Sequence, residues 1–189
     1  MILALIRHGV TEANEKHLYC GRTDIALSDT GIIDLKIRAQ IPKPFDPAQM
    51  QVITSGMLRC EQTLSLLFGD IPHTSDPAFR EMDLGCFEMR SYEELKDDPA
   101  YITWISGDNE ANIAPGGESG AIMRDRVLAA LDRLIADGRD TILVTHAGVI
   151  AVIMAHLFPD ENKNRYEWQP DPGEGYIADL GAHTYKPFS

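Results

Sequence analysis

Cysteine is scarce in this sequence, and the three cysteines form no recognisable pair. Cys20, Cys60 and Cys86 are widely spaced and show no C-x-x-C motif. A disulfide framework needs an even set of cysteines, and a structural zinc site needs closely spaced cysteine or histidine ligands. We therefore expect neither disulfide bonds nor a zinc site, and interpret all three cysteines as reduced packing residues.

Long apolar runs are also missing. The first hydrophobic stretch, residues 1–6, is followed at once by Arg7 and His8. It is too short for the apolar region of a signal peptide, and it has neither a basic flank nor a small-residue cleavage site. No other run approaches the roughly 18 apolar residues of a membrane span. We therefore expect a cytoplasmic protein.

Basic residues are outnumbered by acidic ones. Seventeen Lys and Arg stand against 29 Asp and Glu, which gives a net charge of −12, and no basic cluster interrupts the acidic composition. Such a surface does not attract nucleic acid or anionic membranes at long range. We expect neither of these as a partner. An arginine that binds an anion here must do so locally, inside a pocket.

The apolar residues that are present follow an α/β pattern. Residues 2–6 and 141–145 are continuous apolar runs typical of strands buried on both faces, and residues 51–54 are a weaker third. Helical spacing of apolar residues occurs at 29–39 behind Ser28, from a capping Ser55 to Gly69, at 118–136 and at 147–157. This alternation predicts a three-layer α/β/α sandwich with a mostly parallel central sheet.

Two segments depart from that pattern. Residues 91–117 contain short polar helical pieces interrupted by proline and glycine, which indicates a small helical lid inserted into a single domain over residues 1–189. Residues 159–175 contain three prolines and two glycines, and predict a loop that leads to short closing strands near 176–180 and 183–185.

Polar side chains follow the predicted strands. Arg7 and His8 come directly after the first strand, Ser55 and Arg59 follow the weaker one, and His146 follows the strand at 141–145. Ligands of open α/β sheets bind beyond the carboxyl ends of the strands. Two arginines and two histidines at this edge favour a phosphoryl group, because guanidinium donates to two phosphate oxygens and neutral imidazole can attack phosphorus.

Each of these residues also has an ordinary structural explanation. A histidine at a strand end is commonly a hydrogen-bonded structural residue, and Arg59 alone fits a solvated helix position. Glu81 fits a solvated surface strand over residues 79–88. Alternatively, a carboxylic acid with a raised pKa supplies the proton that a departing alkoxide needs. The phosphoryl interpretation depends on all of them occurring together.

Six ordered motifs identify a resemblance that covers nearly the whole chain. They are LIRHGVTEAN (5–14), GRTDIALSDTG (21–31), TSGMLRCEQT (54–63), REMDLGCFE (80–88), PGGES (115–119) and LVTHAGVI (143–150). In this order and spacing they resemble the histidine phosphatase superfamily, often called phosphoglycerate mutase-like. Six motifs in series are far more specific than any one of them.

The resemblance implies a role for each residue that matches. It implies that His8 is the nucleophile that becomes phosphohistidine and that Glu81 protonates the leaving oxygen. It also implies a set of side chains that bind the phosphoryl oxygens, namely Arg7, Arg59 and His146. A further group matches the loop next to the substrate, namely Asn14, Gly21 and Thr23. We expect no metal and no cofactor, because arginines and histidines supply the positive charge.

The sequence departs from the commonest family pattern at the leaving-group side. Cys86 to Met89 replace a frequent Trp-Glu-Gly, Ala147 replaces a frequent glycine, and Arg22 replaces the tryptophan usual in mutases. The motifs GRTD and REMDLG resemble the small-molecule phosphatase branch, which includes α-ribazole phosphatases. We therefore expect a phosphatase of a small phosphorylated metabolite. The alternatives are a cofactor-dependent phosphoglycerate mutase and a non-catalytic phospholigand-binding module, and the motifs favour no oligomeric state.

Overall fold

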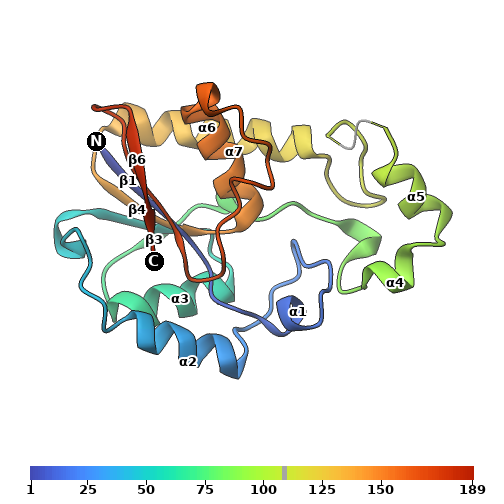
Figure 1. Ribbon diagram of the computed structural model, residues 1–189, viewed down its shortest axis with the longest axis horizontal. Coiled ribbons are helices and arrows are strands. Elements are labelled where there is room, and N and C mark those ends of the chain that lie inside the picture. Colours follow the sequence, from blue (N-terminus) through green and yellow to red (C-terminus); the bar gives the residue numbers. More distant parts are fainter. Residues whose placement is uncertain (108–109) are drawn as a thin grey trace.

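A six-stranded sheet forms the centre of the computed structural model, which describes residues 1–107 and 110–189 (Figure 1). The strands are β1 (Ile2–Arg7), β2 (Gln51–Thr54), β3 (Thr74–Ser75), β4 (Thr141–Thr145), β5 (Gly175–Asp179) and β6 (Thr184–Phe188). Their order in the sheet is β3-β2-β4-β1-β5-β6. Pairing is parallel from β3 to β1, and antiparallel from β1 through β5 to β6. The mostly parallel sheet predicted from the sequence is confirmed.

Two long helices cover each face of this sheet, as Figure 1 shows. They are α6 (Gly120–Asp137) and α7 (Ala147–Leu157) on one face, and α2 (Asp29–Arg38) and α3 (Leu58–Phe68) on the other. Leu3 and Leu5 of β1 pack in the core under α6 and α7, whereas Ala4 and Ile6 pack in the core under α2 and α3. Because successive side chains of a strand point to opposite faces, one continuous apolar run supplies both cores. The predicted three-layer sandwich is confirmed.

The helix boundaries follow local capping, with one exception to the sequence prediction. Ser28 accepts a hydrogen bond from Gly31 N at the start of α2, as expected. The predicted cap at Ser55 is wrong: α3 begins at Leu58 after Met57, which makes no side-chain cap hydrogen bond. The Ser55 hydroxyl instead lies 2.9 Å from Nε2 of His146. A serine three residues upstream of a helix resembles a cap in the sequence, and only the tertiary structure reveals that its partner is a histidine after the neighbouring strand.

A smaller helical insertion projects from the body of the molecule (Figure 1). It contains α4 (Tyr92–Leu95) and α5 (Pro99–Ile105) and has its own apolar cluster, in which Phe87, Leu95 and Tyr101 are buried. This matches the short helical pieces expected between residues 91 and 117; residues 108 and 109 of that range lie outside the described residues. The remaining elements are α1 (Glu12–Glu15) and the 3-10 turns η1 (Pro47–Gln49), η2 (Pro77–Phe79), η3 (Gly85–Phe87) and η4 (Pro159–Glu161).

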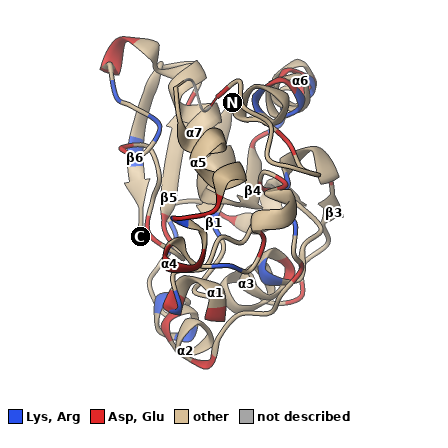
Figure 2. Ribbon diagram, turned by 90° about the vertical axis from the view of Figure 1, so that its right-hand side faces the viewer, with Lys and Arg blue, Asp and Glu red and all other residues tan. Residues whose placement is uncertain are grey.

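Charged residues of both signs are interspersed on the outer helices. Figure 2 shows basic and acidic positions side by side on α6, which carries Arg124, Asp125 and Arg126 in succession. In the described part of the chain, no helix is both long enough and apolar enough to cross a membrane.

Candidate active site

Two neighbouring parallel strands bring the two predicted site histidines together. Arg7 is the last residue of β1 and pairs in register with Thr145, the last residue of β4. The next residue of each strand is a histidine, and His8 N donates to Thr145 O at 2.9 Å, which extends the ladder by one step. The His8 and His146 rings therefore lie edge to face, with centroids 5.2 Å apart.

The surroundings of His8 leave its Nε2 with a free lone pair. Its Nδ1 lies 2.7 Å from the carbonyl oxygen of Gly9, and because a carbonyl can only accept, Nδ1 carries the proton. Burial, together with the positive charges of Arg59 and Arg7, lowers the pKa of His8 well below its usual value. At neutral pH the ring is therefore neutral. A neutral, oriented imidazole with an unprotonated Nε2 is the form that can act as a nucleophile.

His146 is completely buried between β4 and α7. Burial and the charge of Arg59 lower the pKa of His146 well below its usual value, so this ring is also neutral at neutral pH. Its Nε2 contacts the Ser55 hydroxyl at 2.9 Å. Its Nδ1 is buried and has no hydrogen-bond partner among the described residues. An unpaired buried polar atom costs free energy, so this atom indicates a ligand position.

Arg59 is only 1% exposed, although it lies in the first turn of α3. Its guanidinium donates to the carbonyl oxygens of Gly21 at 2.7 Å and Thr23 at 2.9 Å. Neither acceptor carries a formal charge, so the buried positive charge has no carboxylate partner in these hydrogen bonds. Burying such a charge is costly, and an anionic ligand would compensate that cost.

Arg7 is held by the loop that follows α7. One terminal nitrogen donates to the carbonyl of Pro170 at 2.8 Å, while the buried Nε has no hydrogen-bond partner in the described chain. Burial lowers the pKa of the Arg7 guanidinium, and the Glu81 and Asp171 carboxylates act in the opposite direction. Like Nδ1 of His146, Nε of Arg7 is a buried nitrogen without a hydrogen-bond partner among the described residues.

Glu81 reaches the start of α7 from an irregular segment after η2. Its Oε2 accepts from Gly148 N at 3.0 Å, and its Oε1 accepts from Met82 N, also at 3.0 Å. A side chain at position 148 would collide with the carboxylate, because a Cβ there would lie 2.4 Å from Oε1. The close approach of Glu81 to the helix therefore requires glycine at position 148.

Arg126 of α6 holds the segment that carries Glu81, and sequence reasoning did not select it. Its guanidinium donates to the carbonyl oxygens of Ala78, Arg80 and Glu81 at 2.7–3.0 Å. It also pairs with Glu118 at 2.8 Å. No sequence motif connects residues 78–81 to a helix 45 or more positions later.

The loop over residues 21–23 is held by Glu88, a second residue that sequence reasoning did not select. The Glu88 carboxylate accepts from the backbone N–H groups of Gly21, Arg22 and Thr23 and, at 2.6 Å, from the Thr23 hydroxyl. Because the carbonyls of Gly21 and Thr23 hold Arg59, Glu88 supports that arginine indirectly. Asn14 lies in α1, where its Oδ1 accepts from the backbone N–H and hydroxyl of Thr11. The structure thus ties Gly21 and Thr23 to Arg59, whereas the contacts of Asn14 are to its own helix cap.

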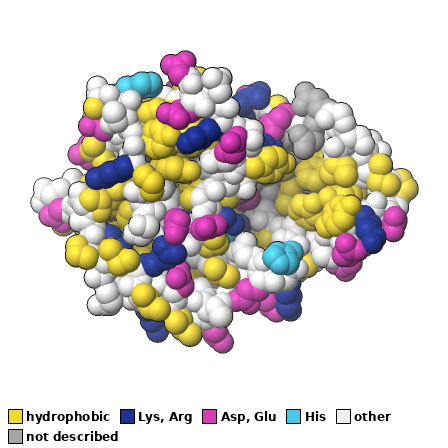
Figure 3. All heavy atoms as spheres, viewed as in Figure 1, with side chains coloured by type: hydrophobic (Ala, Val, Ile, Leu, Met, Phe, Trp, Pro, Cys, Tyr) yellow, Lys and Arg dark blue, Asp and Glu magenta, His cyan; other side chains and the backbone are white. Residues whose placement is uncertain are grey.

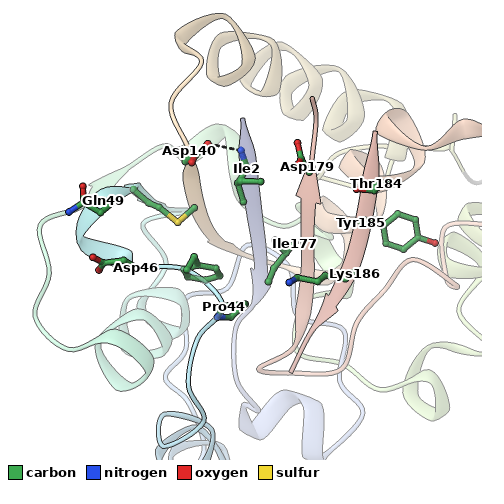
Figure 4. Close-up of a pocket in the computed structure, with 12 residues that line it drawn as sticks. Ile2, Pro44, Asp46, Gln49, Asp140, Ile177, Asp179, Thr184, Tyr185 and Lys186 are labelled. Carbon is green, nitrogen blue, oxygen red and sulfur yellow. Dashed lines mark hydrogen bonds between the residues drawn. The ribbon is translucent and has the colours of Figure 1, made fainter. Parts of the chain in front are cut away.

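The surface is hollowed between the body of the molecule and the helical insertion, and Figure 3 shows hydrophobic side chains gathered beside this hollow. A different cavity, of about 410 Å³, lies toward the other end of the central strands, near the start of β1 (Figure 4). Ile2, Ile177 and Asp140 line it, and Asp140 accepts from Ile2 N at 2.7 Å. It contains none of the candidate site residues and lies at the amino end of β1, away from the edge where α/β sheets bind ligands.

Across residues 1–107 and 110–189, no group of three or more His, Cys, Asp or Glu side chains is placed to hold a metal ion. The charged and polar groups that converge at the carboxyl ends of β1 and β4 are two neutral histidines, two arginines and one glutamate. Such a cluster is suited to a phosphoryl group between cationic donors, with one imidazole as nucleophile and one carboxyl group for proton transfer.

Comparison with known proteins shows which family this chain is similar to. The family model for the histidine phosphatase superfamily (branch 1) matches residues 3–185. The chain is 32% identical over 165 residues to an adenosylcobalamin/α-ribazole phosphatase of Salmonella typhimurium, which covers 83% of this chain and 79% of the relative. It is 28% identical over 175 residues to a 2,3-bisphosphoglycerate-dependent phosphoglycerate mutase of Xanthobacter autotrophicus, with 82% and 80% covered.

A solved structure extends the similarity to three dimensions. The crystal structure of the α-ribazole phosphatase from Shigella flexneri superposes with a TM-score of 0.85 at 28% identity, and covers 98% of this chain and 94% of that one. Fold and site thus define an α/β protein with two histidines and two arginines gathered at the carboxyl ends of its parallel strands. The chain belongs to the histidine phosphatase superfamily, branch 1.

Proposed function

We propose that the protein is a phosphomonoester hydrolase that acts on a small phosphorylated metabolite through a phosphohistidine at His8. The observation that carries this proposal is a pair of buried nitrogen atoms without a hydrogen-bond partner among the described residues, Nε of Arg7 and Nδ1 of His146, beside a neutral His8. Phosphoryl oxygens would satisfy the Arg7 donor, and also Nδ1 of His146 where that nitrogen carries the ring proton. The imidazole next to them has an unprotonated Nε2 that can attack phosphorus.

The reaction takes two steps that share one set of residues. In the first, His8 Nε2 forms a bond to phosphorus while the bond to the ester oxygen breaks, and Glu81 gives its proton to the departing alkoxide. In the second, the Glu81 carboxylate takes a proton from water, whose oxygen attacks phosphorus and releases inorganic phosphate from His8. Arg7, Arg59 and His146 donate to the phosphoryl oxygens throughout.

Around this centre we assign supporting roles. Gly21 and Thr23 act through their carbonyls, which aim Arg59 at the phosphoryl group. Asn14 contributes its amide nitrogen, since its Oδ1 is occupied by Thr11. The helical insertion around α4 and α5 acts as a lid of the single domain.

The alternative is a phosphoglycerate mutase, because mutases of this superfamily are also similar to the chain. A mutase returns the phosphoryl group to an acceptor, whereas we expect His8 to pass it to water. A panel of phosphorylated metabolites, scored by release of inorganic phosphate, should contain at least one good substrate. With 3-phosphoglycerate and catalytic 2,3-bisphosphoglycerate, we expect less 2-phosphoglycerate than phosphate. Isomerisation that greatly exceeds phosphate release would replace the phosphatase proposal by the mutase.

Glu81→Gln should slow the hydrolysis of alkyl phosphates far more than that of aryl phosphates such as p-nitrophenyl phosphate. Only a basic alkoxide needs its proton during departure, and glutamine cannot supply one. The ratio of kcat/KM for the two substrate types, measured for wild type and variant, tests this. Glu161→Gln, at an exposed position in η4, is the matched control. An equal loss on both types would show that Glu81 does not protonate the leaving group.

A further inference from the structure

Ser55 and His146 each directly follow one of two neighbouring parallel strands, β2 and β4. Thr54, the last residue of β2, pairs with Val144 of β4. The next residue, Ser55, donates its backbone N–H to the Val144 carbonyl at 3.2 Å. Ser55 and His146 are both fully buried. The serine hydroxyl and Nε2 of the histidine are 2.9 Å apart.

The other contacts of the Ser55 hydroxyl determine which atom donates in that hydrogen bond. Met57 N–H points at the hydroxyl oxygen at 3.4 Å and can only donate, so it uses a lone pair of Oγ. The hydrogen of the hydroxyl then has two candidate acceptors, Nε2 of His146 and the Cys60 sulfur, with which Ser55 also forms a side-chain hydrogen bond. An unprotonated imidazole nitrogen is the much stronger acceptor of the two. The direction of the bond between Ser55 and His146 decides the tautomer of the histidine, because a neutral imidazole carries one proton for two nitrogens.

Cys60 is the neighbour that would favour the other tautomer of His146, with the proton on Nε2. Burial raises the pKa of the Cys60 thiol to about 12, so it stays protonated, and the thiol donates to the Thr145 carbonyl at 3.6 Å. Its sulfur lies 3.7 Å from Nε2 of His146 and could accept from a protonated Nε2. Sulfur is a weak acceptor, however, and the serine hydroxyl is a stronger donor. The balance between the two neighbours favours an unprotonated Nε2.

We propose that Ser55 is a positioning residue: by donating to Nε2 it holds His146 as the tautomer with its proton on Nδ1, aimed at a phosphoryl oxygen. The unpartnered, buried Nδ1 is the atom that this tautomer turns into a donor. The backbone bond from Ser55 N already joins β2 to β4, so the hydroxyl is not needed to pair the strands. The phosphoryl part of this inference rests on the proposed function; the tautomer part does not.

The test combines NMR with kinetics. Long-range ¹H–¹⁵N spectra of the full chain labelled with ¹⁵N-histidine, with His146 assigned by a His146→Asn variant, should show an unprotonated Nε2 in wild type and in Ser55→Thr. Ser55→Ala should shift His146 toward the Nε2-protonated form and lower kcat/KM by about 10- to 100-fold, the usual range when a group that orients a functional histidine is lost. Added inorganic phosphate should shift the Nδ1 signal in wild type.

Ser65→Ala, at an exposed serine on α3, is the matched control and should change neither readout. A protonated Nε2 in wild type would overturn the proposal, and so would a Ser55→Ala protein with the wild-type tautomer. If no phosphoester is hydrolysed by wild type, the proposed function fails, while the tautomer comparison between wild type and Ser55→Ala still decides the role of the serine. Thermal unfolding of each variant separates a folding defect from the positioning effect.

Discussion

His8→Ala should reduce phosphate release by at least about a thousandfold, because the substitution removes the only group that forms the bond to phosphorus, while the arginines left behind only stabilise charge. The initial rate on the best substrate of the metabolite panel is the measurement. The folded state should persist, since the substitution removes a side chain whose hydrogen bond is to the adjacent Gly9 carbonyl.

His156→Ala provides the matched control for this experiment. His156 is an exposed histidine in the last turn of α7, so it shares the residue type but not the site. Its rate should stay within a factor of two of wild type. A His8→Ala protein that is folded, free of wild-type contamination and still turns over at a comparable rate would rule out nucleophilic attack by this residue.

Arg59→Ala should have the second largest effect. Arginines that bind phosphoryl groups in the transition state are worth roughly 10³ to 10⁵ in rate in other phosphoryl-transfer enzymes. In addition, the substitution leaves the carbonyls of Gly21 and Thr23 without their donor, which should destabilise the protein by about 1–3 kcal/mol. Arg59→Lys should rescue little, because a single ammonium cannot reach both carbonyls and the phosphoryl group in the fixed geometry of a guanidinium.

The effects on rate and on stability are measured separately, by kcat on the same substrate and by the midpoint of thermal unfolding. Arg133→Ala on α6 is the control, since Arg133 is a largely exposed arginine that pairs with Asp76. A loss of kcat smaller than about tenfold, roughly 1.4 kcal/mol, would show that Arg59 is a bystander to the reaction.

Much of the fold was predictable from local patterns, for identifiable reasons. Residues 2–6 are apolar at every position, and residues 141–145 have an apolar centre between two threonines, which suits strands between two helical layers. The structure confirms both strands with ends within one residue. The antiparallel attachment of β5 to β1 was not predictable. It depends on how the loop over residues 159–175 returns across the sheet, and loop paths of that length have no local signature.

Some residues of the site could be predicted from the sequence, and others could not. His8 and His146 could be placed at one edge because each directly follows a strand, and parallel strands end together. Glu88 and Ser55 could not be assigned, because their partners are distant in the chain: Glu88 binds a loop about 65 positions earlier, and Ser55 binds a histidine 91 positions later. A charged residue in a turn and a serine before a helix both have commoner explanations, and only tertiary contacts distinguish the alternatives.

The covalent intermediate is the central claim, and rapid-quench labelling tests it most directly. Wild-type protein mixed with a ³²P-labelled substrate and quenched in base within one turnover should carry label that is lost in acid, as a phosphohistidine is, and peptide mapping should place it on His8. His8→Ala should carry none, and Glu81→Gln should accumulate more than wild type if its base function is needed for release. Label on any residue other than His8, or turnover without a labelled protein intermediate, would contradict the account.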